Sequence, residues 1–137
     1  NDAFINGTVR TLSKEAQLLI VKRLKELCKG YSRGFGGKIK LDYNYGYPPT
    51  VNHPRETKFA AEVAKEIVGV QNVDMNAKPI MASEDFSYMI EKRPGCYFHV
   101  GQGVGAAVHN PKYDFNDELS PIGASFFVKL VEKANPV

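Results

Sequence analysis

The chain has 137 residues, of which 43% are hydrophobic, and its 18 basic and 15 acidic side chains give a net charge of +3. This length suffices for one ordinary hydrophobic core or for two small half-domains. The charge excess is mild and forms no block of like charges, so composition gives no reason to expect a nucleic acid or a membrane as partner.

The cysteines and the first residues of the chain bear on its cellular compartment and on whether it belongs to a longer protein. Cys28 and Cys96 form no CxxC motif and lie in unrelated apolar contexts, which favours reduced thiols in a cytoplasmic protein. We find no signal peptide and no apolar run long enough to span a bilayer. The sequence begins with Asn1 rather than Met, and strand-like sequence follows almost at once. We therefore expect a piece of a longer cytoplasmic protein.

Residues 1–51 follow a pattern typical of a strand, a helix and a second strand. Apolar and polar residues alternate over residues 3–12, which predicts the first strand. Ser13 is a favourable N-cap, and apolar residues recur with helical spacing until Gly30, so we expect a helix of about four turns. Strict alternation over residues 38–47 predicts the second strand. The segment therefore predicts a β-α-β unit, half of a small two-layer α+β domain.

A proline-rich stretch, residues 48–54, breaks this pattern, and we place a domain boundary there. The rest of the chain alternates between helical and strand-like patterns. In order, we expect a helix from Pro54 to Val68, a strand at residues 78–81, a helix capped by Ser83, a strand at residues 96–100 and a helix that begins at Pro121. This order predicts one edge of an α/β sheet, with ligands gathering at the loops beyond the strand ends.

The stretch from Val108 to Asp117 is the strongest candidate for chemistry. His109 follows a run of small residues and lies two residues before Pro111, so its loop backbone is restricted. Neutral imidazole is a good ligand for zinc, and a nearby carboxylate such as Asp114 or Asp117 can fix its tautomer. A single histidine has no ligand spacing to test, so the alternative is an ordinary polar loop residue.

Five motifs occur along the chain in this order: Gly7-Thr8-Val9-Arg10-Thr11, Tyr47-Pro48-Pro49-Thr50-Val51-Asn52, Ser83-Glu84-Asp85-Phe86-Ser87-Tyr88, Pro94-Gly95-Cys96-Tyr97-Phe98 and His109-Asn110-Pro111-Lys112-Tyr113-Asp114-Phe115-Asn116-Asp117. Together they cover essentially the whole chain. In this order and spacing the chain resembles the M20 metallopeptidase family, most closely its branch of hippurate hydrolases and other N-acyl-amino-acid amidohydrolases.

The resemblance implies a two-domain enzyme. A catalytic α/β domain would hold two divalent metal ions, zinc or manganese, and an α+β lid domain would also mediate dimerisation. Residues 1–51 would form the second half of the lid, and residues 52–137 the C-terminal part of the catalytic domain. The parent reaction would be hydrolysis of the amide bond of a small, hippurate-like N-acyl amino acid by metal-activated water. We expect a homodimer, and neither a nucleic acid nor a membrane as partner.

The resemblance also implies roles for single residues. His109 matches the last metal ligand of the family, and Glu84 and Asp85 match its Glu-Asp-Phe motif beneath the site. We interpret these two carboxylates, together with Asn110 and Asp114, as groups that position the site. The alternative for Glu84 and Asp85 is capping of the following helix.

Arg10, His53 and His99 are the remaining candidate residues. Arg10 lies on a lid strand where the resemblance implies a cation for the substrate carboxylate, and a planar guanidinium binds a carboxylate bidentately. The alternative for Arg10 is an ordinary surface salt bridge. We interpret His53 as a residue at a helix start and His99 as a histidine of the core.

The chain lacks segments that resemble the family's first metal-binding motifs and its glutamate base, and one imidazole cannot hold a metal pair. We therefore expect a fragment that is inactive alone. The alternative function is a non-catalytic binding or dimerisation module. RNA binding, suggested by the tyrosines and lysines of residues 38–47, is disfavoured because those tyrosines alternate as core residues would and no strong basic stripe is evident.

Overall fold

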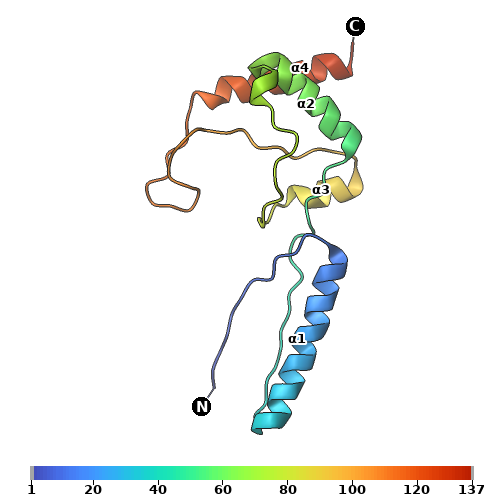
Figure 1. The fold of residues 1–137 in the computed structure, drawn as a ribbon, viewed down its shortest axis with the longest axis vertical. Coiled ribbons are helices and arrows are strands. Elements are labelled where there is room, and N and C mark those ends of the chain that lie inside the picture. The colour runs from blue at the N-terminus through green and yellow to red at the C-terminus, as the bar shows by residue number, and fades with distance from the viewer. Residues whose placement is uncertain (1, 137) are drawn as a thin grey trace. The chain divides into compact units, whose positions relative to one another are not determined.

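The computed structural model describes residues 2–136, and within them it contains helices but no β-strand (Figure 1). The elements are α1 (Lys14–Phe35), α2 (Pro54–Val68), the short 3₁₀ helix η1 (Val70–Asn72), α3 (Phe86–Lys92) and α4 (Leu119–Ala134). The chain divides into two compact units. The first comprises the described residues up to Val51 together with Pro79–Lys92, and the second comprises Asn52–Lys78 and the described residues from Arg93 on.

The predicted α/β fold, with its β-α-β half-lid, is wrong. Residues 3–12, 38–47, 78–81 and 96–100 form no strand in the structure. A strand exists only where a neighbouring strand supplies the other half of a hydrogen-bond ladder, and no such ladder occurs among residues 2–136. The alternation of residues 38–47 therefore reflects two chemically different faces of a lone segment. Whether the two units correspond to a lid and a catalytic domain stays a prediction.

Helix α1 begins where predicted but ends later. Ser13 is its N-cap, and the Ser13 hydroxyl accepts a hydrogen bond from the backbone N–H of Ala16 at 3.1 Å. The predicted end at Gly30 is wrong, because the helix continues to Phe35 and stops at Gly36, whose φ is 67°. A glycine inside a helix costs about 1 kcal/mol, which neighbouring residues can offset. Only the left-handed glycine redirects the chain.

The carboxylate of Glu15 stabilises the first turn of α1. Its pKa lies below the ordinary value because it accepts hydrogen bonds from its own backbone N–H and from the Ser13 hydroxyl. The ionised form is the stabilised one. This contribution is therefore complete above the ordinary pKa and is lost as the pH falls through the lowered pKa.

Two glycine substitutions in α1 are expected to have opposite effects. Gly30→Ala should stabilise the protein by about 0.4 to 1 kcal/mol, since the position is helical and a Cβ there meets nothing within 4 Å. Gly36→Ala should destabilise it by about 1 kcal/mol, although its Cβ also has room, because φ is positive. Urea unfolding followed by circular dichroism measures both. Equal effects from the two variants would contradict the helix end at Gly36.

In the first unit, the extended segment 37–50 runs back along α1 (Figure 1). Val21 on the facing side of the helix is only 4% exposed. Two hollows along this contact are lined from both sides, one with Ile39 and the other with Tyr45 contributed by the extended segment. The backbone N–H of Ile39 also donates to the Ser32 hydroxyl at 3.0 Å. The segment is thus held by side chains of the helix.

In the second unit, α2 and α4 cross and bury a small apolar core (Figure 1). Val63 is fully buried, and Ala60 and Phe126 pack with it. The ring of Phe98 lies 4.6 Å from that of Phe126 and closes one side. The partly buried residues around this core are Ala64, Ile67, Cys96 and Leu130. Because apolar burial is worth about 1.5 to 3 kcal/mol per large side chain, so small a core leaves little reserve of stability.

The predicted ends of α2 are confirmed, whereas α3 and α4 begin at other residues than expected. Helix α2 begins with Pro54 and is capped at its C-terminus by Gly69, whose N–H donates to the Lys65 carbonyl. Helix α3 begins only at Phe86. Helix α4 begins at Leu119, two residues before the predicted Pro121, and follows a turn closed by hydrogen bonds to Asn116.

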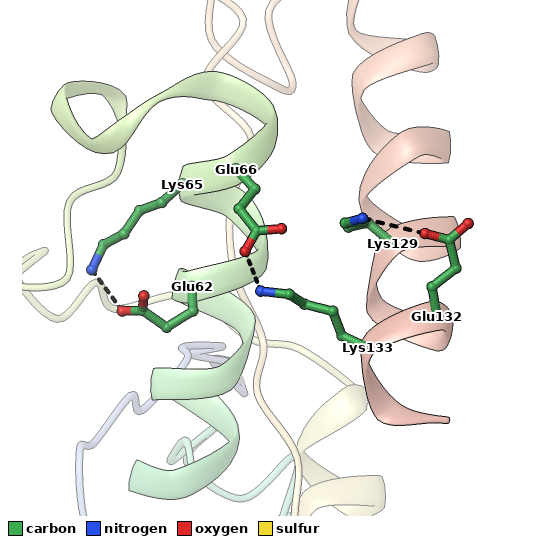
Figure 2. A network of polar contacts seen from close by, with 6 residues as sticks. All are labelled: Glu62, Lys65, Glu66, Lys129, Glu132 and Lys133. Atoms are coloured by element: carbon green, nitrogen blue, oxygen red, sulfur yellow. Dashed lines mark hydrogen bonds and ion pairs between the residues drawn. The ribbon is translucent and has the colours of Figure 1, made fainter. Parts of the chain in front are cut away.

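Three ion pairs lie along and between α2 and α4 (Figure 2). One pair, between Glu66 and Lys133, joins the two helices, and the others lie within a helix. The intrahelical pairs are Lys65 with Glu62 at 2.8 Å and Lys129 with Glu132 at 3.4 Å. The hydrogen bond from Lys65, followed by the positive charge of the same side chain, holds the pKa of Glu62 below its ordinary value. Such exposed pairs contribute little, so the apolar contact dominates the helix packing.

Asn52 and His53 form hydrogen bonds with the backbone of Gly95 and Tyr97. The amide of Asn52 donates to the Tyr97 carbonyl at 2.7 Å and accepts from the Tyr97 N–H at 2.8 Å. The backbone N–H of His53 donates to the Gly95 carbonyl at 3.1 Å, and the backbone N–H of Gly95 donates to the ring atom Nδ1 of His53 at 3.2 Å. His53 is also the N-cap residue of α2, which confirms its interpretation as a helix-start residue.

Removing this amide should destabilise the second unit. Asn52→Ala removes both hydrogen bonds between the Asn52 amide and the half-buried backbone of Tyr97, so we expect a loss of about 1 to 3 kcal/mol in the free energy of unfolding. The matched control is Asn72→Ala, whose exposed amide donates to the Val68 carbonyl and whose loss should cost less than about 0.5 kcal/mol. Denaturant titration compares the two. Similar losses in both variants would mean that the pairing with Tyr97 stabilises nothing.

Candidate functional site

His109 lies at the second central position of a tight turn on the loop that precedes α4. The turn is closed by the Asn110 N–H, which donates to the Ala107 carbonyl at 3.1 Å. The φ of His109 is 72°, and among residues 2–136 no other residue except glycine has a positive φ. This left-handed conformation costs a residue with a Cβ about 1 to 2 kcal/mol. Backbone strain of this kind is concentrated at functional sites, which makes the residue worth testing.

Asn110 joins this turn to a second one. Its side-chain Oδ1 accepts from the Lys112 N–H at 2.9 Å, and its carbonyl accepts from the Tyr113 N–H, also at 2.9 Å. Pro111 fixes the backbone between these two bonds. The Tyr113 hydroxyl donates to Oε1 of Gln102 at 3.2 Å and so ties the end of the loop to its beginning. The loop that presents His109 is therefore braced at several points.

Among residues 2–136, the predicted metal ligand His109 belongs to no group of three potential ligands. His109 and Asp114 are both exposed on their loop. Within the part of the chain that the structure describes, no three histidine, cysteine, aspartate or glutamate side chains form a group that could hold a metal ion. Catalytic zinc usually takes three protein ligands. The donors of these residues alone therefore do not fit a metal centre.

In the first unit, the structure places Arg10 next to the segment that carries the two predicted carboxylates. Nη1 of Arg10 donates to the Ser83 hydroxyl at 2.8 Å. Glu84 is half-buried; its Oε1 accepts from the Phe86 N–H at 3.3 Å at the start of α3. Asp85 is exposed, and its carbonyl begins the first turn of that helix.

The sequence patterns do not predict several of the side-chain contacts that hold these two segments. Ser83 was expected to cap a helix, but its hydroxyl accepts from Arg10 instead. Gln102 and Tyr113 were not singled out, since a contact between side chains 11 positions apart leaves no periodic signal. His99 was assigned to the core, yet it is exposed, with its ring edge against Tyr97 at 5.2 Å. That assignment is wrong, because the strand in which it would have been buried does not form.

Comparison with known proteins identifies the class of this chain. Residues 3–133 match the Peptidase family M20/M25/M40, and the chain belongs to that family. It is therefore part of a family of hydrolytic enzymes that includes amidohydrolases, as its motifs predicted.

Several curated relatives match along nearly the whole chain. It is 36% identical over 131 residues to a hippurate hydrolase of Campylobacter jejuni, a match that covers 96% of this chain and 34% of that protein. It is 34% identical over 138 residues to an N-acetyldiaminopimelate deacetylase of Streptococcus suis, covering 97% and 36% of the two chains. It is 31% identical over 123 residues to a putative amidohydrolase of Bacillus subtilis, covering 86% and 31%. The chain thus spans about a third of the length of these relatives.

No solved structure matches this chain. Among the helices of residues 2–136, none combines the length and the apolar character that crossing a membrane requires.

Proposed function

We propose that this chain is part of a metal-dependent amidohydrolase that cleaves the amide bond of small N-acyl amino acids. The observation that carries the proposal is the family match over residues 3–133, together with relatives named for the hydrolysis of hippurate and of an N-acetylated amino acid. The braced loop around His109 supports it, because the backbone cost of that turn needs a compensating role.

In this proposal His109 supplies one imidazole to a divalent metal, zinc or manganese. The other ligands would come from polypeptide outside these residues, because the described part of the chain holds no group of three candidate ligands. Asn110 and Asp114 would hold the ligand loop, and the hydrogen bonds of Asn110 support its part. The isolated chain is expected to be inactive.

Arg10 would bind the carboxylate of the substrate in the same proposal. Its guanidinium is exposed, and the Ser83 hydroxyl satisfies only one of its several donors. A planar guanidinium held at one corner suits a second, bidentate partner. Glu84 and Asp85 would position this segment, and the contact of Glu84 with the start of α3 is consistent with that role.

The cellular setting is proposed from chemistry alone. Cys28 and Cys96 are both free, as is usual in the reducing cytoplasm. The assembly would be a homodimer, formed through the first unit, that acts on a small-molecule substrate.

A chimera tests the proposed function. In it, this chain replaces the 131 aligned residues of the Campylobacter jejuni hippurate hydrolase. The folded chimera is expected to hydrolyse hippurate or another N-acyl amino acid of a small panel, to lose this activity with a chelator, and to regain it with zinc or manganese. The isolated chain should show no turnover. A folded, metal-loaded chimera that cleaves no member of the panel would contradict the proposal, and so would enzyme-like turnover by the isolated chain.

A second candidate, a dimerisation module without catalysis, is favoured by the strong exposure of Phe4 and Ile5, at 92% and 97%. Sedimentation of the isolated chain without metal distinguishes it. A concentration-dependent dimer that Phe4→Ser and Ile5→Ser abolish, combined with an inactive chimera, would favour this candidate.

A further inference from the structure

One flank of α1 carries a row of four cations. Lys22, Lys25, Lys29 and Arg33 follow one another at intervals of three, four and four residues, and all four are exposed. This spacing places them on one side of the helix. With a rise of 1.5 Å per residue, the row is about 16 Å long.

The row borders a groove formed by two hollows between α1 and the extended segment 37–50. All four cations line the two hollows of this groove, and apolar side chains lie between them. The apolar residues of the lining are Leu18, Val21, Ile39 and Leu41, with the ring of Tyr45 beside them. The surface therefore combines a basic edge with an apolar floor.

The positive charge of the groove is not neutralised locally. Its one acidic lining residue, Glu26, already pairs with Arg23 at 2.6 Å. A second copy of the same surface would bring like charges together, so the grooves of two copies of this chain would repel each other. The charge favours an acidic partner of another kind.

We propose that this groove docks an acidic amphipathic helix of a partner protein. Carboxylates repeated every three or four residues along a helix have the same axial spacing as the cations of α1, so several ion pairs form in one register. Apolar side chains on the same face of the partner cover Leu18 and Leu41, which the phosphates of a polynucleotide would leave exposed. The surface thus favours a helix over RNA.

The test uses the whole chain and a labelled synthetic helix with glutamates at positions i, i+3, i+7 and i+11 and leucines beside them. Fluorescence anisotropy is expected to show saturable binding that weakens as salt rises. Lys25→Glu combined with Lys29→Glu should raise the dissociation constant by about tenfold, since exposed ion pairs are each worth up to about 1 kcal/mol. Circular dichroism verifies that the variant keeps its helices.

Two controls decide the outcome. Lys58→Glu combined with Lys78→Glu changes the net charge equally at exposed positions outside α1 and should leave binding unchanged. A peptide of the same composition with the glutamates out of register should bind at least about tenfold more weakly. Equal loss in the two double variants, equal binding of the two peptides, or tighter binding of single-stranded RNA than of the helix would each overturn the proposal.

Discussion

Replacing His109 by alanine in the hippurate hydrolase chimera is expected to lower its activity by more than about 100-fold and to lower its metal content. Mutation of residues that merely support a metal ligand already costs 10- to 100-fold, and loss of the ligand itself costs more. Steady-state hydrolysis and elemental analysis of the purified protein measure the two effects. The matched control is His99→Ala, another exposed histidine of the second unit, which should change neither.

A glycine at the same position separates the imidazole from the backbone. His109 has a φ of 72°, so His109→Gly should relieve the left-handed backbone and stabilise the protein by about 1 kcal/mol. It should nevertheless abolish activity as fully as alanine does. An active, metal-loaded glycine variant would show that the residue serves only to form the turn.

The second large effect is expected in the core between α2 and α4. Phe126 is 6% exposed and packs on Val63, so Phe126→Ala should destabilise the second unit by about 3 to 5 kcal/mol. Its neighbour Phe127 is 61% exposed, and Phe127→Ala should cost less than about 1 kcal/mol. Urea unfolding followed by the loss of helical signal compares them.

The comparison of these two phenylalanines also tests how α4 faces α2. If Phe127→Ala lowered the free energy of unfolding more than Phe126→Ala, α4 would present a different face to α2 from the one described above. If Phe126→Ala left no folded second unit at all, Phe126→Leu should restore folding with a smaller loss, because most of the apolar volume returns.

The helices could be predicted where one residue sets an end by its own chemistry. Pro54 suits the first turn of α2 and cannot continue a preceding helix, and Ser13 offers an oxygen to the first turn of α1. The end of α1 was misjudged because glycine has two meanings: Gly30 is tolerated inside the helix, while Gly36 stops it through a left-handed φ. Sequence does not reveal which glycine has positive φ.

The predicted strands are wrong because alternation describes only the faces of a segment and not the neighbour with which a strand must pair. Tyr43 and Tyr45 keep the alternation, and their rings meet edge to face at 5.0 Å. Pairing depends on a second segment at the right distance, which no local pattern encodes. The charged row of α1 was missed for a related reason: its cations are separated in sequence and gather only when the helix forms.

The candidate site was predicted in part. The constraint on the loop of His109 followed from Pro111, whereas the left-handed turn did not, since non-glycine residues seldom adopt it. The contact of Arg10 with Ser83 joins residues 73 positions apart, and no spacing rule finds such a pair. The roles assigned to His109 and Arg10 stay predictions until the chimera is assayed.

The pairing of Asn52 with Tyr97 has a consequence for chemical ageing. Deamidation requires the backbone nitrogen of the next residue to attack the side-chain amide. Here that nitrogen, of His53, donates to the Gly95 carbonyl, while both polar atoms of the Asn52 amide are engaged by Tyr97. Deamidation at this asparagine therefore requires the second unit to open first. Its slow appearance in stored protein would record how often that opening occurs.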